Sequence, residues 1–156
     1  MKTSDIIISV IVIVSTLSPF IYLYFYSKSS YYKVFKSLKD FMNSHNFHLS
    51  AFEIWASKGI AIDTTHKVLL YCNLSNINTT FVELKNINFI DLCASKNEIL
   101  IELKSKRGHS TIISIYDSLE DDPFQKGHYF EIAKKWVNNC KFLISTERNI
   151  VPPKAA

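Results

Sequence analysis

One predicted turn carries side chains that could do acid–base chemistry. The stretch GIAIDTTHKVLLYC, residues 59–72, has two apolar runs joined by Asp63, Thr64, Thr65 and His66. Asp and His at this spacing could act as a general acid–base pair, but such a pair needs a third group and a cleft. A turn between adjacent strands supplies neither, and Asp at the start of a turn commonly accepts hydrogen bonds from backbone amides. The sequence therefore predicts a structural role for Asp63.

Histidine and cysteine are the other candidate chemical groups. The five His have no metal-ligand spacing, so we expect neither a metal nor another cofactor. Cys72, Cys93 and Cys140 are widely spaced and odd in number, which favours a reducing compartment over a disulfide framework. Cys72 or Cys93 could be the nucleophile of a cysteine-dependent enzyme, but apolar strand residues are the preferred interpretation.

Two charged clusters could bind ions. Lys104, Lys106 and Arg107 form a basic hairpin tip that could contact a phosphate or anionic lipid headgroups, or simply be a solvated turn. The acidic residues at 117 and 120–122 lack the ligand spacing of a calcium loop, so helix capping and a solvated loop are preferred.

The first segment has the pattern of a membrane anchor. Ile6–Tyr26 contains no charge and would make a helix of roughly 31 Å, close to the thickness of a bilayer core. Its end is aromatic, and Tyr22, Tyr24 and Tyr26 would anchor the membrane interface. A cleaved signal peptide is the alternative, but no small-residue cleavage site follows. We therefore expect residues 1–28 to form a single-pass transmembrane helix.

Lysines after this segment predict its orientation. Lys28, Lys33, Lys36 and Lys39 follow the apolar stretch, whereas Lys2 precedes it. The positive-inside rule then predicts a cytoplasmic carboxy-terminal domain on the inner (plasma) membrane. Much of the formal charge of +4 lies here, so no nucleic-acid partner is expected.

Residues 29–48 predict an amphipathic juxtamembrane helix and a linker. Apolar residues recur at helical spacing, and Lys33, Lys36 and Lys39 occupy the other side. The helix would pack on the domain or lie on the membrane with its lysines near anionic lipid.

Residues 49–145 predict a mainly β, α+β domain. Short runs with a period of two, joined by short polar turns, favour an antiparallel meander of about seven strands. A clear amphipathic helix follows, with Asp122 as its cap, Pro123 at its first position and Trp136 on its apolar stripe. That helix should cover an open side of the sheet, and residues 146–156 are expected to be a flexible tail.

This plan resembles a family of small, uncharacterised bacterial membrane-anchored proteins with a pleckstrin-homology-like domain. The resemblance rests on these stretches: residues 53–55, 59–63, 67–71, 90–93, 115–117 and 133–136. It implies a β-barrel of about seven strands capped by a carboxy-terminal α-helix.

The expected function is a non-enzymatic binding or scaffolding module at the cytoplasmic membrane face, with an unknown protein or peptide as its partner. The groove between a sheet edge and the carboxy-terminal helix is the usual place for such contact. The alternative is a sensor of anionic lipid headgroups that uses the basic hairpin and the juxtamembrane lysines. The sequence does not indicate an oligomeric state.

Overall fold

The computed structural model contains two long helices and seven strands. It describes residues 3–76 and 78–148, but not the side chains of residues 3–11, 23–27, 78, 147 and 148. The long helices are α1 (Thr3–Ser44) and α2 (Lys126–Arg148), and two 3-10 turns are η1 (Leu84–Asn86) and η2 (Pro123–Gln125). The strands are β1 (Ala51–Trp55), β2 (Lys58–Asp63), β3 (Val68–Asn73), β4 (Asn78–Glu83), β5 (Ile87–Ala94), β6 (Glu98–Ser105) and β7 (Ser110–Asp117).

The strands form two antiparallel sheets in chain order. Sheet A has the order β1-β2-β3-β4, and sheet B has the order β5-β6-β7. The 3-10 turn η1 separates β4 from β5, and no ladder joins the two sheets within the described residues. Antiparallel strands followed by a helix are present, but the predicted single barrel of seven strands is wrong because the ladder is interrupted between β4 and β5.

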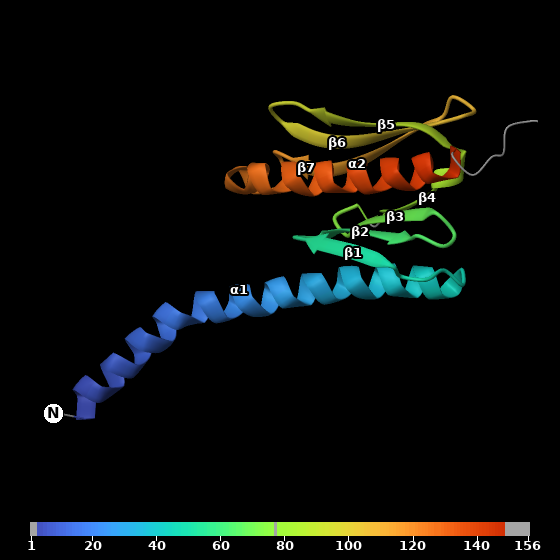
Figure 1. Ribbon diagram of the computed structural model, residues 1–156. Coiled ribbons are helices and arrows are strands. Elements are labelled where there is room, and N and C mark those ends of the chain that lie inside the picture. Colours follow the sequence, from blue (N-terminus) through green and yellow to red (C-terminus); the bar gives the residue numbers. More distant parts are fainter. Residues whose placement is uncertain (1–2, 77, 149–156) are drawn as a thin grey trace, which may run out of the picture.

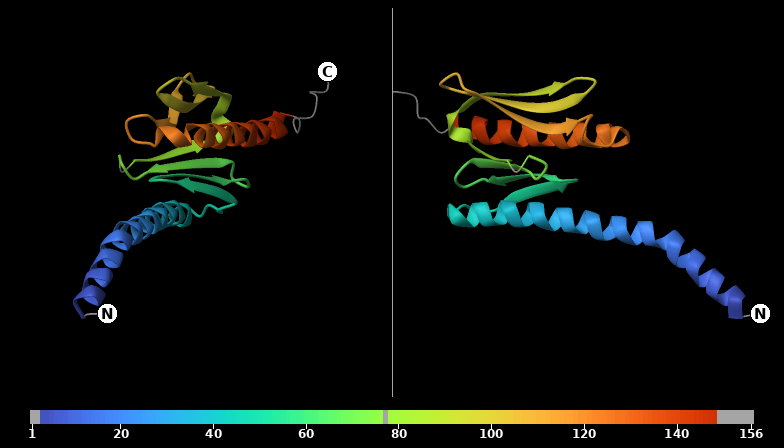
Figure 2. Two further views of the ribbon diagram at one scale, coloured as in Figure 1. Left: turned by 90° about the vertical axis from the view of Figure 1, so that its left-hand side faces the viewer. Right: turned by 180° about the vertical axis from the view of Figure 1, so that it is seen from behind.

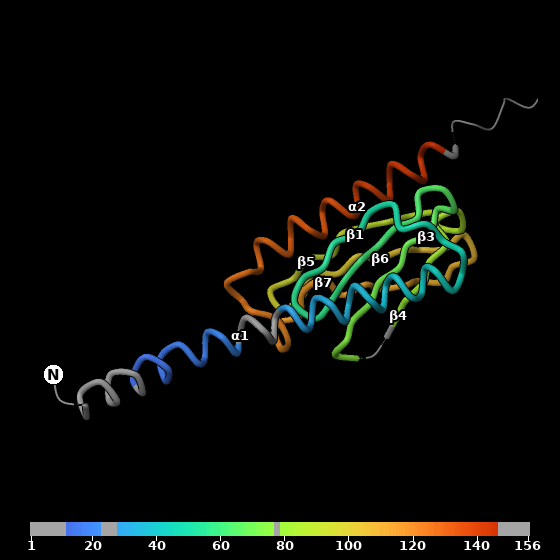
Figure 3. Tube along the Cα trace, turned by 90° about the horizontal axis from the view of Figure 1, so that it is seen from below, coloured from blue at the N-terminus to red at the C-terminus, as the bar shows by residue number. Residues whose placement is uncertain are grey.

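The elements lie in layers. From one side to the other these are α1, sheet A, then α2 and sheet B (Figure 1), and the rotated views show the same order (Figure 2). In the view from below, α1 lies across sheet A and α2 runs along one side of the strands (Figure 3). The helix after the strands therefore closes the space between the sheets, as an amphipathic helix must to bury its apolar stripe.

The main core lies between the sheets and α2. Side chains from both sheets meet the apolar stripe of α2, where Trp136 is 1% exposed. Trp55 of β1 donates its indole N–H to the carbonyl of Ile115 over 3.1 Å, and Tyr71 of β3 donates its hydroxyl to the carbonyl of Ser114 over 2.5 Å. Side chains of sheet A thus hold the backbone of β7.

A second apolar cluster lies on the outer face of sheet A. Val34, Leu38 and Met42 of α1 pack there against Ala61 and other residues of the central strands. All residues of β2 and β3 are buried, so these strands are covered on both faces. This arrangement accounts for their nearly continuous apolar sequence, since alternation is expected only where one face meets water.

Gly59 allows the close approach of α1 to β2. A Cβ atom at this position would lie 2.5 Å from Cγ1 of Val34 and 3.0 Å from Cδ1 of Leu38. Both distances are shorter than ordinary van der Waals contact. A side chain at residue 59 would therefore push the helix from the sheet.

The predicted transmembrane anchor is not supported. Nowhere in the described chain is there a helix with the length and apolar character that crossing a membrane requires. This finding contradicts the single-pass anchor of residues 1–28, the integral membrane partner and the inner-membrane localisation with a cytoplasmic domain.

α1 continues as one helix through residue 28, where the predicted boundary between an anchor and a juxtamembrane helix lies. Tyr22 is 67% exposed on it, whereas the side chains of Tyr24 and Tyr26 lie outside the described part. The helix ends at Ser44, and the φ of 56° at Asn46 lets the amide of Phe47 donate to the carbonyl of Met42. Of the predicted tail, Thr146 to Arg148 belongs to α2, and residues 149–156 lie outside the described residues.

Candidate ligand-binding surfaces

The turn after β2 is organised by the buried carboxylate of Asp63. One oxygen accepts the amides of Thr65 and His66 over 2.8 and 2.9 Å. The other lies 2.6 Å from Nδ1 of His66 and accepts the amide of His48 over 2.7 Å. Burial alone raises the pKa of Asp63, but these hydrogen bonds outweigh it and lower the pKa to about 2. The carboxylate is therefore ionised and fully engaged in holding the turn.

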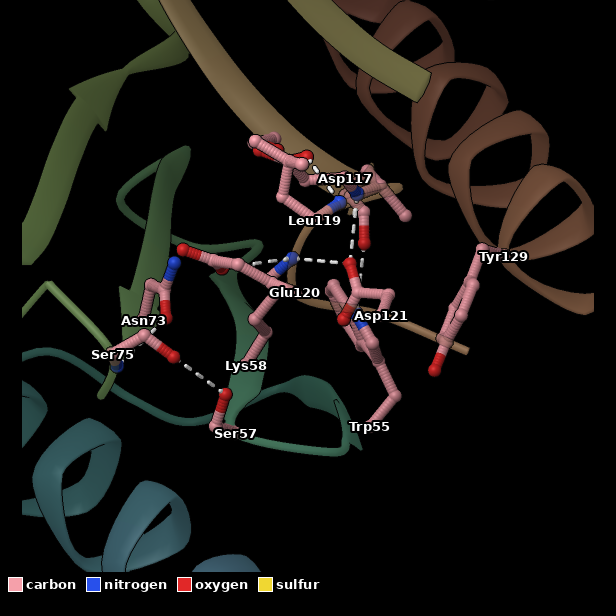
Figure 4. A network of polar contacts seen from close by, with 12 residues as sticks. Trp55, Ser57, Lys58, Asn73, Ser75, Asp117, Leu119, Glu120, Asp121 and Tyr129 are labelled. Carbon is pink, nitrogen blue, oxygen red and sulfur yellow. Dashed lines mark hydrogen bonds and ion pairs between the residues drawn. The ribbon is translucent and has the colours of Figure 1, made fainter. Parts of the chain in front are cut away.

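A buried ion pair joins β2 to the loop after β7 (Figure 4). Nζ of Lys58 lies 2.6 Å from Oδ2 of Asp121 and 3.7 Å from Oε2 of Glu120. The same oxygen of Asp121 accepts the amide of Asp117 over 2.8 Å. Burial, with the nearby carboxylates of Asp121 and Glu120, raises the pKa of Tyr71 far above its usual range, so its hydroxyl stays protonated.

Sequence reasoning missed this network because its members are far apart in the chain. Lys58 precedes an apolar run, and Asp121 belongs to an acidic cluster that was interpreted as capping and a solvated loop. A Lys close before an apolar run is a signal that could have indicated burial, because a buried ammonium requires a partner.

A groove lies between the edge strand β5 and α2. It has a volume of about 160 Å³ and is lined by Asn88, Phe89, Ile90, Lys141, Ile144 and Ser145. Among the described residues, β5 pairs with β6 on one side and with no strand on the other, and a bulge shifts its register between Ile87 and Phe89. The sequence indicated a groove of this kind but named none of these residues.

Glu53 fixes α2 beside sheet A. Its carboxylate oxygen Oε2 accepts the indole N–H of Trp136 over 2.8 Å and lies 3.0 Å from Nζ of Lys135. Trp136 thus has both an apolar and a polar anchor. This contact holds one wall of the β5–α2 groove in place.

The residues predicted to cap the carboxy-terminal helix lie one short element before it. Asp122 accepts the amide of Phe124 over 3.0 Å, and Pro123 is the first residue of η2. These residues therefore begin η2, and α2 starts at Lys126. Nζ of Lys126 reaches back to the carbonyls of Ser95 and Lys96 over 2.9 and 2.8 Å, so the β5–β6 turn fixes the start of α2.

The two predicted basic groups do not share a surface. Lys33, Lys36 and Lys39 belong to α1, which covers the outer face of sheet A. Lys104, Lys106 and Arg107 lie at the β6–β7 turn in the opposite layer (Figure 1).

Two lysines of the basic hairpin also make contacts with nearby residues. Lys104 pairs with Glu102 over 3.3 Å, and Nζ of Lys106 donates to the carbonyl of Lys85 over 2.8 Å. This geometry does not favour joint contact of both groups with one flat layer of headgroups.

No hydrogen bond joins a cysteine to a histidine in the part of the chain that the structure describes. Cys72 and Cys140 are buried, and Cys93 is exposed on β5. Burial raises the pKa of Cys140 to about 12, and Sγ of Cys72 contacts Oγ of Ser37 at 3.5 Å. No metal-binding group of three or more His, Cys, Asp or Glu occurs within residues 3–76 and 78–148 whose placement is described.

The chain was compared with family models, curated proteins and solved structures, and none of them matches. The resemblance to membrane-anchored proteins with a pleckstrin-homology-like domain therefore stays a prediction, with its barrel and anchor corrected as described above.

Proposed function

We propose that this chain is a non-enzymatic binding module that takes an extended segment of a partner protein along β5. The observation that carries the proposal is the coincidence of an open sheet edge with an apolar groove beside α2. An extended peptide can add to such an edge, gaining affinity from backbone hydrogen bonds and specificity from pockets for alternate side chains.

Some amide and carbonyl groups of β5 point away from β6, toward the place where such a segment would lie. The amide of Leu92 donates to the carboxylate of its neighbour Asp91 over 2.9 Å, so it points away from β6. Since ladder groups alternate along an antiparallel strand, Ile90 also directs its amide and carbonyl outward. Asp91 occupies the place that a partner's carbonyl would take.

The groove would take one apolar side chain of the partner. Phe89 is 48% exposed, and Ile90 and Ile144 complete an apolar wall. The volume of about 160 Å³ is close to that of a cavity of roughly 150 Å³ that holds one benzene ring. A Leu, Ile or Phe of the partner fits this space.

The positive charge at the groove favours a partner segment that has an acidic residue next to its apolar residue. Lys141 is the charged residue of the lining, and Nζ of Lys104 lies 5.7 Å from the ring centre of Phe89. We therefore expect a partner segment in which an apolar residue is followed or preceded by Asp or Glu.

The test is selection of linear peptides from a random library on the full chain. Selected peptides should share an apolar residue next to an acidic one, and Ile144→Gln or Lys141→Glu should weaken their binding at least about tenfold, which corresponds to about 1.4 kcal/mol.

Matched controls lie on the same helix. Phe142→Gln removes an apolar side chain that is 70% exposed outside the groove, and Lys134→Glu reverses a charge elsewhere on α2. Neither should change the affinity of the selected peptides. Equal losses in the groove and control variants, or no enrichment of any peptide, would reject the proposal.

A further inference from the structure

Two adjoining pockets lie between α1 and the loops of sheet A. The first, of about 540 Å³, is lined by Ser30, Tyr31, Ile54, Ala56, Ser57, Ser75 and Glu120. The second, of about 390 Å³, is lined by Ser29, Ser30, Lys33, Ser57, Leu74 and Ser75. Because the two linings share Ser30, Ser57 and Ser75, they form one groove, which we call the serine groove.

Hydroxyl groups dominate the shared part of the serine groove. Oγ of Ser57 lies 3.1 Å from Oγ of Ser75, which leaves each hydroxyl further hydrogen-bonding capacity. The hydroxyls of Ser29 and Ser30 make no hydrogen bond to any residue that the structure describes. Each hydroxyl can donate and accept, so the groove suits a ligand that carries both amide N–H and carbonyl groups.

The two pockets carry residues of opposite charge. Glu120 belongs to the first pocket, where its side chain is 34% exposed. Lys33 belongs to the second pocket and makes no ion pair within the described part of the chain. Glu120 therefore lines only the first pocket and Lys33 only the second, while both pockets share the serines.

The buried network supports the carboxylate. Lys58 is bound closely to Asp121, at 2.6 Å, and more loosely to Glu120, at 3.7 Å (Figure 4). Glu120 is held near its position but keeps an exposed face for a cation. Figure 4 shows Glu120 beside Lys58 and the hydrogen bond between Ser57 and Ser75, and all three of Glu120, Ser57 and Ser75 line the first pocket.

We propose that the serine groove binds a short peptide with both termini free. The ammonium of its first residue pairs with Glu120, its carboxylate pairs with Lys33, and its amides meet the hydroxyls of the serines. A volume of several hundred Å³ is within the usual range of small-ligand sites. This site is separate from the β5–α2 groove and does not depend on the function proposed there.

Calorimetric titration of the full chain with trialanine tests the proposal. Trialanine should bind, whereas N-acetyl-trialanine and trialanine amide should each bind at least about tenfold more weakly, because each loses one charged contact. Lys33→Gln should weaken trialanine by a similar factor and leave trialanine amide unchanged. Glu120→Gln should weaken trialanine and leave N-acetyl-trialanine unchanged.

Controls of the same chemistry lie outside the groove. Lys36→Gln, on α1, and Glu131→Gln, on α2, should leave the affinity unchanged. Lys33 is exposed and takes no part in the buried network of Lys58, so its variant tests the site even if Glu120→Gln weakens the fold. No heat of binding with trialanine, or equal binding of the free and blocked peptides, would overturn the proposal.

Discussion

The ammonium group of Lys58 lies 2.6 Å from a carboxylate oxygen of Asp121, and the two side chains are 1% and 2% exposed. Lys58 opens β2 in sheet A, and Asp121 follows β7 of sheet B. The pair therefore joins the two sheets, which share no strand ladder within the described residues. The same carboxylate holds the amide of Asp117 and fixes the path of the chain toward α2.

Replacing one partner of this pair should destabilise the protein strongly. Lys58→Met leaves the carboxylate of Asp121 buried without its cation, which typically costs about 3–5 kcal/mol. Chemical denaturation measures the change in the free energy of unfolding. The double variant Lys58→Met/Asp121→Leu should recover much of the loss, because neither charge is then left unpaired. A double variant as unstable as the sum of the two single ones would contradict this role.

The contact between α1 and β2 should be sensitive to one methyl group. In Gly59→Ala the new Cβ lies 2.5 Å from Cγ1 of Val34, and overpacking of this kind costs about 1–3 kcal/mol. Gly127→Ala is the matched control, because a Cβ there meets nothing within 4 Å and Ala favours helix. It should leave the melting temperature unchanged or raise it.

A second variant distinguishes a steric clash with α1 from a general sensitivity of β2 to substitution. Val34→Ala removes the atom that the new Cβ would meet, so the double variant Gly59→Ala/Val34→Ala should lose less stability than the two single changes added together. Strict additivity would show that α1 does not pack on Gly59.

Acid should remove the contribution of Asp63 to stability. Its pKa is lowered from 3.8 to about 2 in the folded protein, so folding favours the ionised form. That contribution is fully present above pH 3.8 and is lost as the pH falls through about 2. A shift of this size corresponds to about 2 kcal/mol. Asp63→Asn should therefore be less stable than the wild type at pH 6, and the difference should shrink toward pH 2.

Urea denaturation of both proteins at several pH values measures this difference. Asp40→Asn changes an exposed carboxylate on α1 and serves as the control. If the difference in the free energy of unfolding between wild type and Asp63→Asn stays constant from pH 6 to pH 2, the hydrogen bonds do not lower the pKa of Asp63.

Local patterns predicted several elements because their signals lie within a few residues. The apolar stripe around Trp136 indicated α2, and the polar residues 63–66 indicated a turn whose carboxylate binds backbone amides. Both depend on contacts close in sequence. The groove between a sheet edge and the last helix was expected from the resemblance to pleckstrin-homology-like domains and not from a local pattern, and the resemblance did not identify which strand supplies that edge.

The remaining features depend on contacts between distant segments. The apolar character of β2 and β3 does not show that α1 covers their outer face, and Lys58 gives no sign of its partner 63 residues later. The apolar beginning of the chain was interpreted as a separate anchor, whereas α1 continues into the segment that packs on sheet A. Two sheets and one barrel share the same local strand pattern, so the sequence could not distinguish them.

Hydrogen exchange of the full chain, with and without a selected peptide, tests the central claim most directly. Addition of a strand to β5 should slow exchange at the outward-facing amides of Ile90 and Leu92 and leave β2 and β3 unchanged, since those strands are already paired on both sides. Protection at β5 that is lost in Ile144→Gln would support a binding module at the β5–α2 groove. Protection at another strand, or none in the presence of bound peptide, would contradict it.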